Sequence, residues 1–499
     1  MPNTVYQQVQ TPDIDYSAFD LSHEVRTTGI MGDLIPCFLS EIVPGDDFQV
    51  NTRHVIRMAP MLYPLFHEVN VYFHYFFVPN RILWDDWEDF ITGGEQGNSA
   101  PTFPQYDIND LDYTTRRAKL ADYLGLPITT GSAENSSVKV SQLPFRAYLQ
   151  IYNDYYRDQN QTNTVEFGIN NVVVKKRAWE KDYFTSSLPW TQRSTSRIQI
   201  PVDIDYSDLP TFDFVGNQTG GSSIQTSFTG STNINLKASG QQVTQIDNID
   251  QLNMDIAELR RATAIQRWLE LSARTGSRYV EHLASNFGVR NGDERLQRAE
   301  YLGGGKEKLQ ISEVLQTAEG TTGDVGFFAG HGISTGQKAG FRQKFTEHGY
   351  VIGIMSVLPR TGYHQGIDRH WSRTDKFDYY NPLFAHIGEQ AVLNQELFFD
   401  PLDVDYNEST FGYQQRFAEY KQMKSSSHAE FRDAGGLLPW HLDRVFTSQP
   451  TLGEDFIEAD PDTRIFNITD ASLADHLWCY LHHNVQARRP MPYFANPSL

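Results

Sequence analysis

Apolar and polar side chains alternate most clearly within residues 34–78. Within residues 48–58 every second position is buried in character: Phe48, Val50, Thr52, His54, Ile56 and Met58. The intervening positions are Gln49, Asn51, Arg53, Val55 and Arg57. A period of two predicts a β-strand with one buried face and one wetter face.

The segments on either side of this strand extend the β pattern. Residues 34–43 form a largely apolar run, and residues 44–47 (PGDD) have turn chemistry, so the sequence predicts a hairpin with residues 48–58. Residues 69–77 alternate again with bulkier side chains, and Pro79 ends that strand because proline cannot donate to a ladder. This order favours a large antiparallel β-structure over a βαβ fold.

Helical periodicity appears in three places. Asn80 can cap a short helix, and residues 145–156 form an amphipathic helix with an aromatic stripe. Such a stripe could stack on bases, but packing in the core is the favoured interpretation. Residues 252–288 predict a helical insertion of two helices, the first ended by Gly276.

The rest of the chain gives weaker signals. Residues 349–358 (GYVIGIMSVL) predict a buried strand ended by Pro359. Residues 290–309 resemble a loop, with Gly303–Gly305 as a break, and residues 385–499 look irregular. Residues 207–250 are rich in Gly, Ser, Thr, Asn and Gln, with interspersed Ile, Phe, Leu and Val that favour an ordered surface insertion over a flexible linker.

Strands near both ends, with helices and loops between them, predict one mainly β domain over residues 1–499. A double-sheet antiparallel jelly roll accepts long insertions because its loops emerge at the ends of the sheets. The 499 residues exceed the usual size of one core, which fits such insertions.

Charge limits the partners of the chain. The net charge is −20, and residues 1–20 contain no Lys or Arg. The general surface is therefore unsuited to nucleic acid, so DNA contact requires a local basic patch or a separate basic partner.

Cysteine use and hydropathy indicate the compartment. Cys37 and Cys479 are far apart and form no CxxC pair, so both are expected to be buried small hydrophobes. The N-terminus has no signal-peptide pattern, and the longest apolar run, residues 350–358, is too short for a membrane helix. We expect a soluble protein made in the cytoplasm, without membrane insertion.

Catalytic and metal-binding motifs are missing from the sequence. It contains no P-loop, no GxSxG elbow and no HExxH helix. Asp403, Asp405 and Asn407 copy the start of a calcium loop, but Glu408 and Gln414 replace its required glycine and glutamate. No catalytic residue, metal or cofactor is therefore expected. Carboxylates are abundant, as a glycosidase requires, but nothing in the sequence singles out two of them as a catalytic pair.

Basic residues gather at few positions, each of which could neutralise phosphates or form an ordinary solvated or salt-bridged face. Arg53 and Arg57 share the polar side of the strand at 48–58. The other candidates are Lys175, Lys176, Arg177, Arg488 and Arg489.

Several separated stretches resemble the major capsid proteins of the Microviridae, and most of all the gokushovirus-like branch. They are LIPCFLSEIVPGDDF and RMAPMLYPLFHEVNVYFHYFFVPNRILWDDWEDFITGG within 34–94, LPFRAYLQIYNDYYRDQN at 143–160, residues 259–304 starting LRRATAIQRWLEL, FTEHGYVIGIMSVLPRTGYHQGI at 345–367, and the tail RRPMPYFANPSL. Together they cover most of the chain in the family's order.

The resemblance implies a viral jelly roll with long loops, which self-assembles into a T=1 icosahedral shell around circular single-stranded DNA. It also implies a small basic DNA-binding virion protein, a pilot or minor virion protein, and assembly in the host cytoplasm into a virion. In this branch a variable loop projects at the threefold axes, and residues 207–250 are the candidate here. Its candidate contacts with the bacterial host surface are Asn217, Thr219, Phe228, Asn233 and Lys237.

Two other classes share some of these features. Aromatic richness, acidity and threonine-rich hairpins also suit an all-β glycan-binding protein or glycan-active enzyme. A phage spike would be expected to show a repeat or a coiled coil, and neither is visible in the sequence.

Overall fold

The computed structural model describes residues 15–92, 100–108, 111, 120–127, 138–192, 256–275, 292, 296–315, 317, 328–432, 435–468 and 474–494, with four two-residue strands between 203 and 253. Two compact units are distinguished, Gln192–Arg274 and the remainder of the chain. Among the described residues, no helix is both long enough and apolar enough to cross a membrane.

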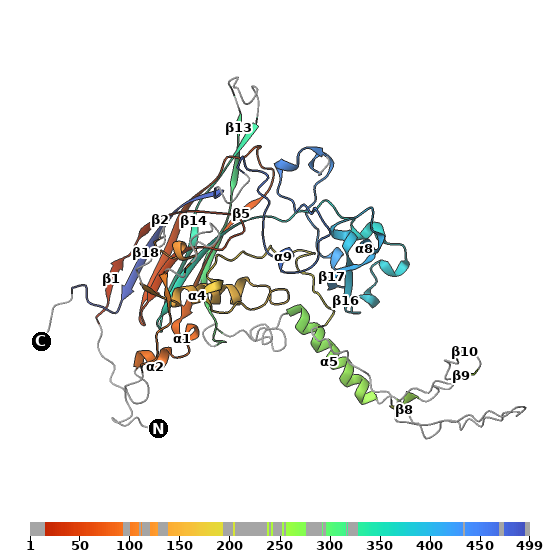
Figure 1. Ribbon diagram of the computed structural model, residues 1–499, viewed down its shortest axis with the longest axis horizontal. Coiled ribbons are helices and arrows are strands. Elements are labelled where there is room, and N and C mark those ends of the chain that lie inside the picture. Colours follow the sequence, from red (N-terminus) through yellow and green to blue (C-terminus); the bar gives the residue numbers. More distant parts are fainter. Residues whose placement is uncertain are drawn as a thin grey trace, which may run out of the picture. The chain divides into compact units, whose positions relative to one another are not determined.

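Two antiparallel sheets form the centre of the larger unit (Figure 1). The six-stranded sheet contains β1 (Ser17–Asp20), β2 (His23–Gly29), β4 (Asp47–Met58), β13 (Gln310–Leu315), β14 (Phe328–Lys344) and β18 (Leu477–Arg489). The four-stranded sheet contains β3 (Ile35–Ile42), β5 (Val69–Pro79), β12 (Glu300–Lys308) and β15 (Gly349–Pro359).

The strand order is that of a jelly roll. One sheet has the order β2-β18-β4-β14 and the other β3-β15-β5-β12, with β1 and β13 added to the first. The chain crosses between sheets at each step from β2 to β5 and again from β14 through β15 to β18. The predicted fold class is therefore confirmed.

The core between the sheets confirms the alternation that the sequence showed. Phe48, Val50, Ile56 and Met58 of β4 are buried in a cluster that includes side chains of both sheets, and Thr52 and His54 on the same side of the strand are buried as well. The alternate positions of β4, Gln49 to Arg57, are exposed or half-buried. Cys37 and Cys479 are buried there as free thiols, as expected of small hydrophobes.

The four-stranded sheet is covered on its second face as well. There Phe76, Ile352 and Ile354 pack with α4 (Leu143–Ile151) and the π-helical turn Tyr152–Tyr156 that follows it. The hydroxyl of Tyr148 donates to the carbonyl of Leu34 at 2.9 Å. The aromatic stripe is thus a packing surface, and the core interpretation is confirmed.

The predicted hairpin between residues 34–43 and 48–58 is wrong. Among the described residues β3 pairs with β15 alone, whereas β4 pairs with β14 and β18, so the turn carries the chain from one sheet to the other. The reason lies in the patterns themselves: β3 is buried at most positions on both faces, and β4 needs one wet face. Strands with such different requirements belong to different sheets.

Residues 300–308 form β12, not the expected loop. This strand pairs with β5, with a bulge between Tyr301 and Gly303. A Cβ on Gly304 would lie 2.1 Å from the carbonyl oxygen of Phe73, and one on Gly303 would lie 2.8 Å from that of Gly340. The glycines therefore permit a close approach of backbones and do not break the chain.

We expect Gly304→Ala to lower the free energy of unfolding by about 2–3 kcal/mol, because the Phe73 carbonyl that it would strike belongs to a paired central strand. Urea unfolding of the full-length subunit measures the change. Gly168→Ala is the control: its Cβ would meet nothing within 4 Å, so the free energy should change by less than about 0.5 kcal/mol. Equal effects of the two substitutions would contradict the packing argument.

The C-terminal region is also more regular than its sequence suggested. β18 lies between β4 on one side and β1 and β2 on the other, at the centre of the six-stranded sheet. Its buried positions are Leu477, Cys479, Leu481, His483, Val485 and Ala487. The irregular tail predicted for residues 385–499 is wrong at this strand.

A buried polar chain connects the two sheets. The ring of His483 lies with Nδ1 2.8 Å from Thr52 Oγ1, and its Nε2 donates to the carbonyl of Cys37 at 2.9 Å. Thr52 also bonds the hydroxyl of Tyr75. Burial, together with electrostatic repulsion from His23, lowers the pKa of His483 to about 4, so this ring is neutral at physiological pH.

Three connections between strands meet at Asp443. His67 Nδ1 lies 3.7 Å from Asp443 Oδ1, and His364 Nδ1 and His441 Nδ1 lie 3.6 and 3.7 Å from Oδ2. Burial favours the neutral carboxyl, but the facing rings of His364 and His441, with Ser427, outweigh it and hold the pKa of Asp443 well below its ordinary value. The four side chains are nearly inaccessible, so this cluster fastens the connections to one another.

The connections contain short elements. They are α1 (Asn80–Leu83), α2 (Trp87–Thr92), β6 (Gln105–Asp107), α3 (Leu120–Tyr123), β7 (Lys139–Ser141), β16 (Glu389–Leu393), α7 (Asn394–Leu397), α8 (Val404–Glu408), β17 (Thr410–Gln415) and α9 (Glu454–Ile457). The smaller unit contains β8 (Asp203–Ile204), β9 (Lys237–Ala238), β10 (Gln241–Gln242), β11 (Leu252–Asn253) and most of α5 (Ile256–Thr275). The second predicted helix of 252–288 lies outside the described residues.

Candidate nucleic-acid interface

One face of the six-stranded sheet is polar and open to solvent. Because directly opposed residues of antiparallel strands share a face, the register defines its members. This polar face comprises Ala18 and Asp20 of β1; Glu24, Arg26 and Thr28 of β2; Asp47, Gln49, Asn51, Arg53, Val55 and Arg57 of β4; Trp478, Tyr480, His482, Asn484, Gln486 and Arg488 of β18; and Ile333, Thr335, Gly340, Arg342 and Lys344 of β14. All of them are exposed or half-buried.

Three of the predicted DNA-facing residues lie on this face. Arg53 pairs across the sheet with His482, and Arg57 pairs with Trp478. At the opposite end of β18, Arg488 lies directly across the sheet from Asp47 in the strand register. Its guanidinium lies 5.0 Å from the ring centre of Tyr16. Each end of the face therefore has arginine, with Asp47 beside Arg488 at one end, and the rows between the ends contain the amides of Asn51 and Asn484 and of Gln49 and Gln486.

Arg53 and Arg57 have charges that the subunit does not neutralise. Neither makes an ion pair with another residue in the part of the chain that the structure describes. Arg26 has a partner in Glu24 at 2.7 Å, but its side chain is 74% exposed, and such surface pairs contribute little. An external anion can therefore bind these arginines with little loss of free energy from ion pairs broken within the subunit.

Lys175, Lys176 and Arg177 lie apart from the polar face and interact within the subunit. Lys176 pairs with Asp460 at 2.8 Å, and burial lowers the pKa of Lys175. Arg177 Nη1 donates to Ser356 Oγ at 3.0 Å, and its guanidinium lies 3.9 Å from the ring centre of Tyr72. The partners of Arg177 lie on β5 and β15 of the four-stranded sheet and that of Lys176 lies in a connection, so the structure does not group the three residues with Arg53 and Arg57.

Arg489 follows Arg488 directly but turns to the other side of β18. Its Nη2 lies 3.3 Å from Oδ2 of the fully buried Asp46 and donates to the carbonyl of Glu41 at 2.8 Å. Its guanidinium also covers the ring of Phe48. This side chain fixes the turn between β3 and β4.

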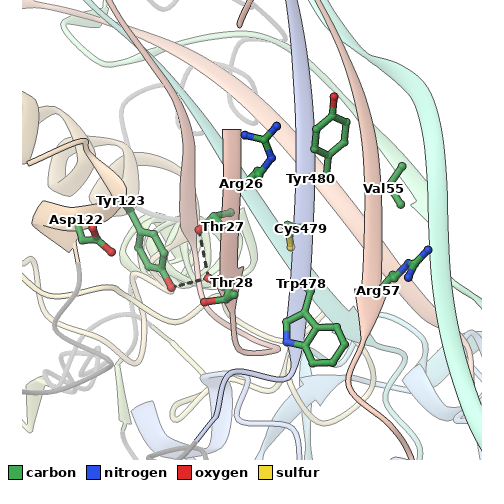
Figure 2. A pocket seen from close by; sticks show the side chains of 10 residues that line it. All are labelled: Arg26, Thr27, Thr28, Val55, Arg57, Asp122, Tyr123, Trp478, Cys479 and Tyr480. Atoms are coloured by element: carbon green, nitrogen blue, oxygen red, sulfur yellow. Dashed lines mark hydrogen bonds between the residues drawn. The ribbon is translucent and has the colours of Figure 1, made fainter. Parts of the chain in front are cut away.

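A shallow pocket lies where the polar face meets α3. Figure 2 shows Asp122 and Tyr123 on one side of it, Arg57 on the far side, and Trp478 and Tyr480 of β18 between them. Arg26, Thr27, Thr28, Val55 and Cys479 complete the lining. Tyr123 donates its hydroxyl proton to the carbonyl of Thr28 at 2.9 Å, which holds this side of the pocket in place.

Trp478, Tyr480 and Arg26 are functional candidates that the sequence did not reveal. Trp478 is 48% exposed, although large aromatics are mostly buried. The guanidinium of Arg26 lies 5.7 Å from the ring centre of Tyr480. The alternation of residues 477–487 was a signal for the strand, but the partners of β18 are hundreds of residues away in the sequence.

The predicted host-contact residues lie mostly outside the described residues, and the calcium-like motif has a structural role. Asn217, Thr219, Phe228 and Asn233 lie outside the described residues, and of Lys237 only the backbone in β9 is described. At the imperfect calcium motif, Asp403 Oδ1 accepts the amide hydrogen of Tyr406 at 2.9 Å and so caps α8. Within the described residues no group of His, Cys, Asp or Glu is arranged to hold a metal ion.

Comparison with known proteins gives matches along the whole chain. Residues 7–499 match the family described as capsid protein (F protein). The chain is 32% identical to capsid protein VP1 of Chlamydia phage 1 and 35% identical to capsid protein VP1 of Bdellovibrio phage phiMH2K, in each case over 99% of this chain and 97% of the relative. Capsid protein VP1 of Spiroplasma virus 4 is 28% identical over 97% of this chain and 96% of its own.

Proposed function

This chain belongs to the capsid protein (F protein) family, and from that premise we propose that the polar face of its six-stranded sheet lines the shell against a single-stranded DNA genome. The family is that of the predicted gokushovirus-like capsid proteins, so the chain is a structural subunit of a virion and not an enzyme. The glycan-binding and glycan-active alternatives find no support in these relatives.

The observation that supports the proposed orientation is the register of β4 and β18. It gathers Arg53, Arg57 and Arg488 on one open face, whereas the four-stranded sheet is covered on both faces. Arginines bind phosphates without regard to sequence, and amides between them can bond sugars or bases. A face of this kind suits a genome that must be packed whatever its local sequence.

We further propose the finer assembly that the resemblance implies. The shell is a T=1 icosahedron around circular single-stranded DNA, assembled in the host cytoplasm. Because the subunit has a net charge of −20 and only a local basic face, a small basic virion protein neutralises much of the genome. A pilot protein completes the particle, and residues 207–250 contact the bacterial host; these two proposals rest on the sequence alone.

Charge reversal tests the DNA-facing role of the polar face. We expect particles of Arg53→Glu, Arg57→Glu and Arg488→Glu to package less DNA, or to release it at lower salt, because each change removes a cation that neutralises one phosphate and adds a repulsion. For the full-length subunit and a single-stranded oligonucleotide, the slope of log affinity against log salt should fall by about 0.7 for each phosphate that is no longer neutralised. Nucleic-acid content is measured from absorbance and particle density.

Lys421→Glu is the control, because Lys421 is exposed in the connection after β17 and lies off the polar face. It has the same change of charge and should leave DNA content and the salt slope unaltered. Unchanged genome content in all three arginine variants would refute the proposed orientation.

A further inference from the structure

We infer that the pocket at Trp478 receives one unstacked base of the single-stranded genome. This assignment deepens the proposed function and rests on it, since the pocket lies on the polar face. A groove that only attracts phosphates needs positive charge, whereas this one adds an exposed indole beside unneutralised arginine. Sheet-borne aromatic side chains that stack on bases are a recurring device for single-stranded nucleic acid.

The side of the pocket formed by β4 is lined by arginine. Arg57 lies opposite Trp478 on the neighbouring strand, and Arg53 lies further along the same side of β4, so a strand of DNA that follows β4 meets two guanidinium groups with no ion-pair partner among the described residues. Phosphates of the nucleotides on either side of the stacked base fit there. Arg26, across β18 from these residues, can release Glu24 to bind a further phosphate.

The carboxylate in the pocket fits a base rather than a phosphate. Asp122 lies on the side away from Arg57 (Figure 2). A carboxylate accepts hydrogen bonds from the amino groups of cytosine, adenine or guanine, and thymine has no such group. A nucleotide satisfies both sides of the pocket at once, because its anionic phosphate and its neutral, hydrogen-donating base lie at opposite ends.

Other features of the pocket make it ready before DNA arrives. Tyr123 is bonded to Thr28, and Thr28 Oγ1 donates to Asp475, so the floor beside β2 is fixed within the subunit. Trp478 lies on a central strand paired on both sides, so its backbone is held. Only the side-chain torsions of Trp478 therefore need to be ordered when a base stacks on the ring, which keeps the entropic cost of binding small.

The test uses the full-length subunit and three 12-nucleotide single strands: oligo-dC, oligo-dT and an abasic strand with phosphates but no bases. We expect oligo-dC to bind about 5- to 100-fold more tightly than the abasic strand, which is the range of one stacked base. Trp478→Ala should abolish that difference, and Trp478→Phe should restore part of it. Trp371→Ala, which removes an indole that is 76% exposed and lies off the pocket, should preserve it.

The outcomes separate this inference from the proposed function. If the abasic strand binds as tightly as oligo-dC, or Trp478→Ala keeps the difference, the base pocket is refuted while the phosphate-binding face stands. If no strand binds, and the arginine variants package normal amounts of DNA, the proposed function fails as well. Equal affinity for oligo-dC and oligo-dT, or a preference that Asp122→Asn does not reduce, would overturn the role given to Asp122.

Ultraviolet cross-linking of filled particles supplies the second measurement. We expect DNA to be joined to the peptide that contains Trp478 and Tyr480, and the yield to fall in Trp478→Ala particles of equal DNA content. Cross-links from this peptide to another protein chain, with none to DNA, would show that a protein occupies the pocket and would overturn the inference.

Discussion

Replacing His483 with alanine is expected to lower the free energy of unfolding of the subunit by about 3–5 kcal/mol. The change removes a fully buried imidazole whose ring centre lies 5.2 Å from that of Phe38. The imidazole also forms hydrogen bonds with the Thr52 hydroxyl and the carbonyl of Cys37. It leaves a cavity and buried polar groups without this partner, and the two costs add. Urea unfolding of the full-length, unassembled chain measures the loss.

His482 provides a matched control for this experiment. It is the preceding residue on β18, but its side chain lies on the polar face. His482→Ala should therefore change the free energy of unfolding by less than about 1 kcal/mol. Similar losses in the two variants would contradict the role of His483 as the polar connection between the sheets.

The same histidine makes stability depend on pH. The pKa of His483 is about 4 in the folded state and near 6.5 in an unfolded chain. Between pH 4 and pH 6.5 the imidazole is therefore protonated in the unfolded state and neutral in the folded state. Stability should fall by about 1.4 kcal/mol per pH unit as the pH drops from 6.5 towards 4. Burial also lowers the pKa of His74 to about 4, which adds a second contribution of the same sign.

Replacing Asp443 with alanine is expected to lower the free energy of unfolding by about 3–4 kcal/mol. Three buried imidazoles lose the carboxylate that they share, and space opens against Gly362, where a Cβ would lie only 2.1 Å from Asp443 Oδ1. Because the cluster joins segments near residues 67, 364 and 441, these connections should become sensitive to limited proteolysis.

Asp443→Asn and Asp460→Ala define what the carboxylate contributes. Asparagine keeps the shape of the side chain without its charge. The loss in free energy of unfolding caused by Asp443→Asn should therefore be seen at every pH above about 4, where the wild-type carboxylate is charged. The wild-type contribution is present above pH 3.8 and is lost as the pH falls below it, since the folded pKa is the lower one. Asp460, whose side chain is 61% exposed beside Lys176, should cost less than about 1 kcal/mol when replaced. An acid limb unchanged in Asp443→Asn would contradict this account.

Local patterns in the sequence predicted single strands well and their partners poorly. The alternation of β4 and the apolar run of β15 follow from which faces each strand buries, so both were visible in the chain. Residues 34–43 looked like the first arm of a hairpin because turn chemistry is local. The structure places them in the other sheet because a strand buried on both faces needs the doubly covered layer.

The candidate site divides in the same way. Arg53 and Arg57 could be assigned to one side of a strand from parity alone. Arg488 and Arg489 are adjacent in sequence and equal in charge, yet one lies on the polar face and the other against the buried Asp46. Trp478, Tyr480 and Arg26 joined the site only through the register of β18 with β2 and β4.

The sequence by itself determined the class of the protein and the faces of its clearest strands, because family motifs, period and charge are properties of neighbouring residues. The tertiary structure alone decided which strands lie side by side, since each pairing of β18 joins residues more than 400 positions apart. The open polar face, the pocket at Trp478 and the buried polar chain through His483 arise from such pairings, and the cluster at Asp443 arises from contacts between connections. Their chemistry depends on distances between segments that local sequence does not encode.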